Sequence, residues 1–310
     1  IMLNIQENIP LAKYTTFRIG GPAKYFVEVS SEEELVETLV YTRKKGLEFF
    51  ILGGGSNVLV SDAGFPGLVI KNKLCRTKIE GETMEIDGGV FLAKVVRDSA
   101  ENNLTGMEWA SGIPGTFGGA VRGNAGAYGG EIKDVLESVK VLDTEKMEIK
   151  VCAKSECDFH YRHSMFKFSP KLIIISAVLK LQEGDKKEIQ KKTQEIISAR
   201  IKKLPQGTPS AGSFFINPVV KNEALIKEFE EDKGVKSKAG KLPAGWLIEK
   251  ADLKGKKVGG AIVNEMQANY ILNTGNATAE DVVILASLIK QKVRVKFGVQ
   301  LKEEVQFVGF

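Results

Sequence analysis

The glycine-dense segment at residues 106–131, GMEWASGIPGTFGGAVRGNAGAYGGE, constrains the fold of this chain more than any other. Its glycines recur every three or four residues, and bulky side chains such as Trp109, Phe117 and Tyr128 interrupt them. A flexible linker avoids such side chains, so a low-complexity linker is the weaker interpretation. Because glycine lets a backbone approach a neighbour closely, the pattern favours a surface that lies against a flat, bulky ligand.

A second group of glycines, ILGGGSNVLVSD at residues 51–62, lies between two short apolar runs. A dinucleotide-binding fingerprint opens a helix and a P-loop ends in Gly-Lys-Ser/Thr, whereas here residues 58–60 continue as a strand. An anion bound at this turn is therefore expected to be held by exposed backbone N–H groups. A plain glycine hairpin is the alternative interpretation.

Hydrophobic periodicity predicts an α+β chain. A strand at 25–29, a helix opened by the capping box Ser31-x-x-Glu34 and a strand at 48–52 form a βαβ unit. Further strands are expected at 58–60, 68–70, 84–87, 135–143, 147–151, 172–181, 261–263, 270–272 and 301–309, and further helices at 91–103, 185–203, 223–231 and 278–297.

The length of 310 residues is typical of two or more domains. A loop of small residues at 206–218, QGTPSAGSFFINP, follows the long charged helix, and we place a domain boundary there. We expect one domain at 1–204, with subdomains of about 1–72 and 73–204, and a second domain at 205–310.

Composition excludes several classes of function. The net charge of +5 is spread along the chain without a basic tail. It suits an anionic small molecule as well as nucleic acid, and we expect no nucleic-acid partner. Three cysteines without a CxxC pair and only two histidines, His160 and His163, predict no disulfide framework and no metal site. No apolar run reaches the ~20 residues of a membrane span, and no signal pattern is present, so we expect a cytoplasmic protein without a membrane partner.

One polar and aromatic stretch, CDFHYRHSMFKFSP at residues 157–170, precedes a strongly apolar strand. Arg162 in this stretch is able to clamp a carboxylate through two parallel hydrogen bonds. From this stretch alone, a solvated strand edge is the favoured interpretation.

Two further stretches carry polar groups next to apolar ones. Ser213 in SAGSFF follows a glycine and precedes two aromatic residues, but the chain lacks the GxSxG of a nucleophile elbow, which disfavours a hydrolase. A serine there can instead donate a proton to a developing carbanion, or Ser210 and Ser213 are turn residues that bind local backbone. Of Glu303 and Glu304, only one is expected to face inward on the last strand, where protection of a sheet edge is the alternative role.

Taken in order, the motifs resemble those of the UDP-N-acetylenolpyruvoylglucosamine reductase family, in its shorter (type II) form. The resemblance covers nearly the whole chain, and the ordered set is specific although no single motif is. It implies a FAD-binding domain of the PCMH/vanillyl-alcohol-oxidase type, built of two α+β subdomains, and a C-terminal α+β substrate-binding domain. The motifs are YTTFRIGG at 14–21, LGGGSN at 52–57, SGIPGTFGGA at 111–120, GNAGAYGGE at 123–131, YRHSMFK at 161–167, SAGSFF at 210–215, PAGWLIE at 243–249 and KFGVQLKEEVQFVG at 296–309.

The resemblance implies an NADPH-dependent reduction of UDP-N-acetyl-3-O-(1-carboxyvinyl)-glucosamine to UDP-N-acetylmuramate for peptidoglycan synthesis. Hydride would pass from N5 of FAD to C3 of this UDP-linked enolpyruvyl amino sugar. In the family's pattern Ser213 is the proton donor to C2, Arg162 stabilises negative charge on the substrate and Glu304 orients or relays the proton. Positions near the substrate are matched by Tyr161, Asn217 and Gln267.

The same matching implies that FAD is bound without a covalent link, because no histidine aligns with a flavin attachment site. GGGSN would cradle the FAD pyrophosphate, and we expect the protein to work as a monomer. The cofactor-binding positions are Thr16, Arg18, Gly20, Gly53, Gly54, Gly55, Ser56, Asn57, Ser111, Gly112, Pro114, Gly115, Thr116, Gly118, Gly119, Ala120, Asn124 and Gly126.

Two positions depart from the family's pattern, and two other functions compete with it. Ile216 stands where many relatives carry lysine, and Gln306 replaces a usual arginine, which puts one substrate contact and the support of Glu304 in question. One competing function is another oxidoreductase of the same flavin fold that uses oxygen. The other is a nucleotide-binding protein without catalysis, which the intact catalytic positions disfavour.

Overall fold

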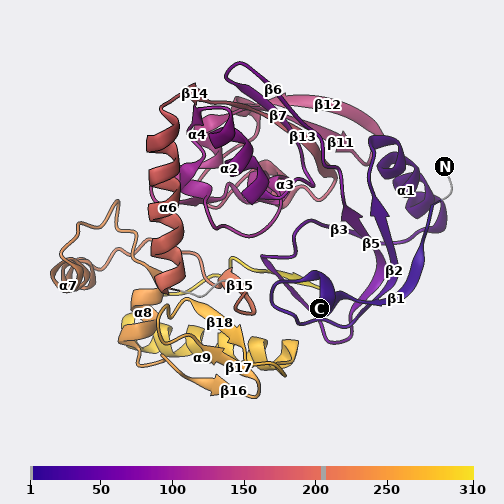
Figure 1. The fold of residues 1–310 in the computed structure, drawn as a ribbon. Helices are drawn as coiled ribbons and strands as arrows, with labels where there is room; N and C mark the ends of the chain where they lie inside the picture. Colours follow the sequence, from indigo (N-terminus) through magenta and orange to yellow (C-terminus); the bar gives the residue numbers. More distant parts are fainter. Residues whose placement is uncertain (1–2, 204–206) are drawn as a thin grey trace. The chain divides into compact units, whose positions relative to one another are not determined.

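The computed structural model describes residues 3–203 and 207–310, and its ribbon is drawn in Figure 1. The chain forms two compact units, each of which is described by itself. Unit 1 comprises the chain up to Ile9 with residues 23–54 and 66–202, and unit 2 comprises residues 10–22, 55–65 and 203–310. The two short segments 10–22 and 55–65 thus group with the C-terminal half of the chain. The predicted boundary between residues 204 and 205 lies outside the described residues.

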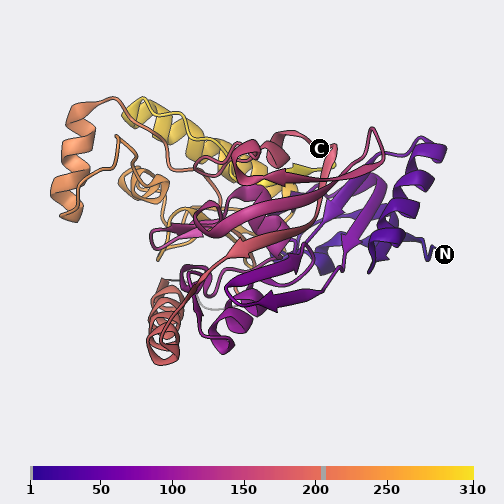
Figure 2. The ribbon, with the colours of Figure 1, turned by 90° about the horizontal axis from the view of Figure 1, so that it is seen from above.

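Unit 1 begins with a sheet whose strands follow the order β1-β2-β5-β3, and helix α1 lies along it (Figures 1 and 2). The predicted cap of α1 is present, because the hydroxyl of Ser31 accepts a hydrogen bond of 3.2 Å from the N–H of Glu34. The carboxylate of Glu34 accepts from Ser30 N–H at 2.6 Å, one residue before the position that a capping box requires. The bounds are β1 Gln6–Pro10, β2 Pro22–Val29, α1 Glu32–Lys45, β3 Phe49–Leu52 and β5 Phe65–Asn72.

A second sheet of unit 1 has the antiparallel order β12-β11-β13-β7-β6. Its central strand β13 is buried on both faces: Ile173 and Ile175 pack with α1 and the first sheet, and Ile174 and Ala177 pack with helices α2 and α3. Burial on both faces explains why this strand reads as a continuous apolar run. The bounds are β6 Thr77–Glu80, β7 Thr83–Asp87, α2 Leu92–Glu101, α3 Phe117–Gly123, β11 Leu136–Asp143, β12 Glu148–Ala153 and β13 Leu172–Lys180.

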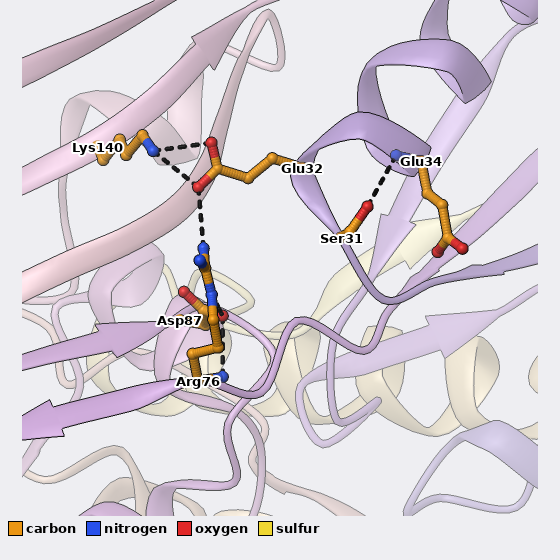
Figure 3. A network of polar contacts seen from close by, with 6 residues as sticks. All are labelled: Ser31, Glu32, Glu34, Arg76, Asp87 and Lys140. Carbon is orange, nitrogen blue, oxygen red and sulfur yellow. Dashed lines mark hydrogen bonds and ion pairs between the residues drawn. The ribbon is translucent and has the colours of Figure 1, made fainter. Parts of the chain in front are cut away.

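Charged side chains join the start of α1 to the second sheet (Figure 3). Both carboxylate oxygens of Glu32 accept from Lys140 Nζ at 2.7 Å, and Oε1 also accepts from Arg76 Nη2 at 3.1 Å. Arg76 Nε in turn donates to the buried carboxylate of Asp87 at 3.2 Å, and this bond raises the pKa of Arg76. The network therefore links the helix of one sheet to two strands of the other.

Unit 2 is built on a sheet of order β15-β18-β17-β16, with helices α8 and α9 in the same hydrophobic core. The predicted capping box of α9 is confirmed, since Thr278 Oγ1 accepts from Asp281 N–H and the Asp281 carboxylate accepts from Thr278 N–H. Phe17, Ile19 and Leu59 pack into this core, which explains why residues 10–22 and 55–65 belong to unit 2. The bounds are β15 Ser210–Ser213, α8 Ala244–Lys250, β16 Lys257–Val258, β17 Ala261–Val263, β18 Tyr270–Asn273 and α9 Ala279–Phe297.

The closing strand is shorter than the predicted 301–309. Only β19, Gln306–Val308, is regular, and it pairs in parallel with β4, Val58–Val60. The preceding residues bind another partner, because Glu303 forms an antiparallel bridge with Phe215. The remaining elements are β8 Leu104–Thr105, β9 Gly126–Ala127, β10 Gly130–Glu131, α4 Ile132–Val135, α5 Met165–Phe168, β14 Gln182–Glu183, α6 Lys186–Lys203 and α7 Glu223–Lys233. Within the described ranges, no helix has the length and apolar character needed to cross a membrane.

Replacing Glu32 by Gln is expected to lower the free energy of unfolding by about 1–3 kcal/mol, because Lys140 and Arg76 lose their shared charged acceptor. The matched control is Glu80→Gln, which breaks an ion pair with Lys78 in which both side chains are more than 60% exposed, and which should cost no more than about 0.5 kcal/mol. Urea denaturation of both variants measures the difference. Equal losses in the two variants would show that the network contributes no more than a surface pair.

Candidate functional site

Two of the glycine segments predicted to bind the cofactor touch each other in unit 1. A Cβ placed on Gly54 would lie 2.5 Å from Cα of Gly115, and a Cβ on Gly53 would lie 2.5 Å from Thr116 Oγ1. No side chain fits at Gly54, so its backbone meets that of Gly115 directly, and Gly53 lies against the hydroxyl of Thr116. The sequence predicted both segments but not their contact, which joins the end of β3 to the loop before α3.

The same part of the sequence, residues 109–116, carries buried polar groups without a partner among the described residues. The hydroxyls of Ser111 and Thr116 and the indole N–H of Trp109 form no hydrogen bond with any described residue, although the three side chains are at most 6% exposed. A buried donor or acceptor left unpaired costs about 1–3 kcal/mol, so such groups normally have a partner. The close backbone cradle and these unsatisfied groups fit a flat, polar ligand such as a flavin nucleotide.

Arg162 lies on a tight turn of unit 1. His160 and His163 close the turn with backbone hydrogen bonds of 3.1 and 3.0 Å, and Arg162 between them has a left-handed φ of 56°. The Nη2 atom of Arg162 donates to the carbonyl of Gly126 at 2.7 Å, and the guanidinium carbon lies 5.2 Å from the ring centre of Tyr161. A non-glycine residue in this conformation is strained, and such strain is concentrated at functional sites.

Neighbouring side chains hold this turn in place. Asn124, which is fully buried, donates to the carbonyl of His160 at 2.8 Å and to the carboxylate of Glu131 at 2.9 Å, and its Oδ1 accepts from Lys133 N–H at 3.1 Å. The predicted contact of Asn124 with the cofactor stays a prediction, since these bonds give its side chain a role within the protein. Gly126 likewise supports Arg162 through its carbonyl.

The two histidines of the chain share one carboxylate beneath this turn. Asp158 lies 3.0 Å from His160 Nε2 and 2.9 Å from His163 Nε2. The hydrogen bond with His163 lowers the pKa of Asp158, so this side chain stays charged until the pH falls through that lowered value. Both histidines therefore stabilise the turn through Asp158.

Ser213 ends strand β15 in unit 2, beside a β-bulge. Ser210 pairs with Leu272 and Ser213 with Tyr270, and the register shifts between these pairs, where Gly212 has a φ of 76°. Bulges next to active sites commonly change the direction of a side chain. The half-buried Ser213 is thus presented by an irregular backbone that only glycine readily adopts at position 212.

Asn269 fixes the two residues that follow Ser213. Its carbonyl accepts from Phe214 N–H at 2.7 Å, and its side-chain amide binds both the N–H and the carbonyl of Phe215, at 3.0 and 2.8 Å. Asn269 is 6% exposed, so no water competes strongly for these bonds. Sequence reasoning missed this residue, because nothing around a single asparagine indicates a partner 54 positions away.

Glu304 lies across from the same segment in unit 2. Its backbone N–H donates to the carbonyl of Phe214 at 2.8 Å, which places it next to the strand that carries Ser213. Asn57 Nδ2 donates to the carbonyl of Glu304 at 3.2 Å, so a predicted cofactor residue also supports a predicted catalytic one. Glu303 is occupied differently, in an ion pair of 2.7 Å with Lys290 on α9.

The N-terminal residues of the predicted cofactor site belong to unit 2. The N–H of Thr16 donates to the carbonyl of Gly55 at 3.0 Å, and its hydroxyl donates to the carbonyl of Ser210 at 2.7 Å. At Gly55, with φ 65°, a Cβ would overlap the carbonyl of Tyr14. Arg18 Nη2 donates to the carbonyl of Gly207 at 3.5 Å.

Two predicted substrate residues of unit 2 make contacts within the protein. Asn217 Oδ1 accepts from Ala244 N–H at 2.9 Å and so binds the first residue of α8. The carbonyl of Gln267 accepts from Tyr270 N–H at 2.9 Å. Their contacts with a substrate stay predictions.

The structure therefore groups the predicted site residues in two sets. Ser213, Glu304 and Asn57 are neighbours in unit 2. Arg162 belongs to unit 1, as do the contacting segments Gly53–Gly54 and Gly115–Thr116.

Comparison with known families gives two matches along the chain. Residues 23–152 match a family described as "FAD binding domain". Residues 204–308 match one described as "UDP-N-acetylenolpyruvoylglucosamine reductase, C-terminal domain". The predicted class of fold, a FAD-binding domain followed by a second α+β domain, is thereby confirmed.

Proteins named UDP-N-acetylenolpyruvoylglucosamine reductase are similar over almost the full length. The one from Caldanaerobacter subterraneus subsp. tengcongensis is 40% identical over 97% of this chain and 93% of its own, and the one from Carboxydothermus hydrogenoformans is 41% identical over 98% and 94%. The crystal structure of the Thermus caldophilus enzyme covers 99% of this chain and 100% of its own at 32% identity, with a TM-score of 0.79. The chain therefore belongs to the UDP-N-acetylenolpyruvoylglucosamine reductase family.

Proposed function

We propose that this chain catalyses the NADPH-dependent reduction of UDP-N-acetyl-3-O-(1-carboxyvinyl)-glucosamine to UDP-N-acetylmuramate, a step of peptidoglycan synthesis. The observation that carries the proposal is the backbone pairing in unit 2 that holds Glu304 beside the Ser213 strand. Ser213 would donate the proton to C2, and Glu304 would orient or reprotonate Ser213. Membership of the family over almost the whole chain supports the same assignment.

The residues present fit FAD as the cofactor. Backbone N–H groups of the loop 53–57 would hold its diphosphate, and the segment 111–120 would lie against it, where the unsatisfied hydroxyls of Ser111 and Thr116 offer hydrogen bonds. When bound, FAD carries a hydride from NADPH to C3 of the enolpyruvyl group. Glycine backbone suits the binding of FAD because, without side chains, it can lie directly against the flat cofactor.

Ser213 would give the proton that the reduction requires. Hydride addition at C3 leaves negative charge at C2, and the new C–H bond at C2 forms as the hydroxyl of Ser213 releases its proton. Glu304 would return a proton to that hydroxyl or orient it. Asn57 would keep Glu304 in place through the hydrogen bond of 3.2 Å that its side-chain amide donates to the backbone carbonyl of Glu304.

Arg162 would stabilise the charge that spreads from C2 into the substrate carboxylate. A fixed donor that meets charge developing in the transition state contributes about 3–4 kcal/mol. The bonds to the turn from Asn124 and Gly126 limit the motion of Arg162, so little reorganisation accompanies the charge. Tyr161 on the same turn, with Asn217 and Gln267, would contact the substrate.

The cytoplasmic location and the monomeric state stay predictions.

Replacing Ser213 by Ala is expected to separate the two half-reactions. Reduction of the flavin by NADPH should proceed at nearly the wild-type rate, whereas reoxidation by the enolpyruvyl substrate should slow by roughly 10²–10⁴, the range for loss of a general acid. Anaerobic stopped-flow absorbance of the flavin measures both rates. Ser210→Ala, on the same strand, is the control and should change neither rate. Equal slowing of both half-reactions in Ser213→Ala would contradict the role of proton donor.

Replacing Gly54 by Val is expected to abolish tight FAD binding, because even a Cβ at this position lies 2.5 Å from Gly115 Cα. The control is Gly123→Ala, where a Cβ meets no atom within 4 Å, and which should bind FAD as the wild type does. Titration of the FAD-free proteins, followed by flavin fluorescence, measures the dissociation constants, and circular dichroism checks that both variants fold. Unchanged FAD affinity in a folded Gly54→Val protein would show that the loop serves another purpose.

A further inference from the structure

Lys71 is a buried lysine on strand β5. It lies on β5 opposite Leu52 of the parallel strand β3, and it is only 8% exposed. Its ammonium group donates a hydrogen bond to the carbonyl of Gly53, the first glycine of the loop that follows β3. The side chain therefore reaches along the sheet to the start of the proposed FAD cradle.

The charge of Lys71 has no anionic partner within the described part of the chain. Its neighbour Lys73 pairs with Glu28 on β2 at 3.7 Å, but no described carboxylate forms an ion pair with Lys71. Burial lowers the pKa of Lys71, the charge of Lys73 lowers it further, and Glu28 opposes the shift. A buried ammonium bound only to a neutral carbonyl is unfavourable unless an anion compensates it.

The bond to Gly53 also sets the direction of the next peptide N–H. In a trans peptide, the carbonyl of Gly53 and the N–H of Gly54 point in opposite directions. Because Lys71 holds the carbonyl, the N–H of Gly54 points away from the lysine, and it donates to no acceptor among the described residues. Gly54 is also the residue whose backbone touches Gly115.

We propose that Lys71 is a positioning residue for the diphosphate of FAD: it orients the Gly53–Gly54 peptide so that its N–H faces the anion, and it supplies a positive charge behind the cradle. The proposal rests on the proposed role of residues 53–57 in binding FAD. Backbone dipoles and a nearby cation act together on an anion, and burial strengthens both. Lys71 itself need not touch the phosphates.

This role makes FAD affinity depend on pH in a defined direction. The protonated form of Lys71 favours the diphosphate, so affinity is full below the pKa of Lys71 in the FAD-free protein and weakens as the pH rises through that lowered value. The other charged groups near Lys71 are Lys73 on its own strand and Glu28 on β2. The neighbouring strand β3, Phe49–Leu52, carries no titratable side chain.

The test compares Lys71→Met and Lys71→Arg with the wild type. The full chain, freed of FAD, is titrated with FAD between neutral and alkaline pH, and flavin fluorescence reports the dissociation constant. Lys71→Met is expected to bind FAD roughly ten- to a hundredfold more weakly at neutral pH. Its FAD affinity should also decrease less than that of the wild type as the pH rises, because the decrease caused by deprotonation of Lys71 is absent. Lys71→Arg, which stays charged, should recover part of the affinity and also lack that alkaline loss.

The matched control is Lys73→Met, an exposed lysine two residues further along, which should change the dissociation constant less than twofold. Urea denaturation of the FAD-free proteins separates positioning from stability, because removing an uncompensated buried charge should leave Lys71→Met at least as stable as the wild type. FAD binding by Lys71→Met within twofold of the wild type, or with the same alkaline loss, would overturn the proposal. Retained affinity in Gly54→Val would instead overturn the proposed cradle.

Discussion

Direct contact between the backbones of Gly54 and Gly115 limits how the two sheets of unit 1 can be arranged. One segment follows a strand of the first sheet and the other precedes a helix packed on the second sheet. The contact is possible only while both sheets keep their mutual arrangement, which the shared core around β13 and the Glu32 network maintain. Packing far from the ligand surface thus determines the spacing of the groups that would bind the cofactor.

Asparagine side chains fix all three candidate catalytic residues. Asn124 binds the turn that carries Arg162, Asn269 binds the residues after Ser213, and Asn57 binds the carbonyl of Glu304. A side-chain amide has both a donor and an acceptor. It can therefore form hydrogen bonds with backbone N–H and carbonyl groups that lie outside regular helices and strands. These amides bind the irregular turn and the residues after the bulge without themselves carrying a charge.

Elements set by local sequence could be predicted, and contacts between distant residues could not. Strands β11 and β12, the caps of α1 and α9 and the glycine segments follow from residues close together in the sequence. The shortening of the last strand depends on its bridge to Phe215, and the anchoring by Asn269 spans 54 positions, so neither leaves a local signal. Lys71 was missed because it directly follows the predicted strand at 68–70, where a lysine is typical of an exposed strand end.

Charge is distributed in a way that suits the proposed chemistry. Around Ser213 the groups that fix the backbone are neutral amides, so in the proposed reaction Glu304 and the substrate would be the charged groups that act on its hydroxyl. Unit 1, in contrast, places cations beside backbone that would meet anions: Lys71 next to the glycine loop and Arg162 on its strained turn. Lys71 is buried and has no carboxylate partner among the described residues, which costs stability in the free protein, and a bound anion would offset that cost. The fold thus leaves part of its electrostatic balance to be completed by the ligand.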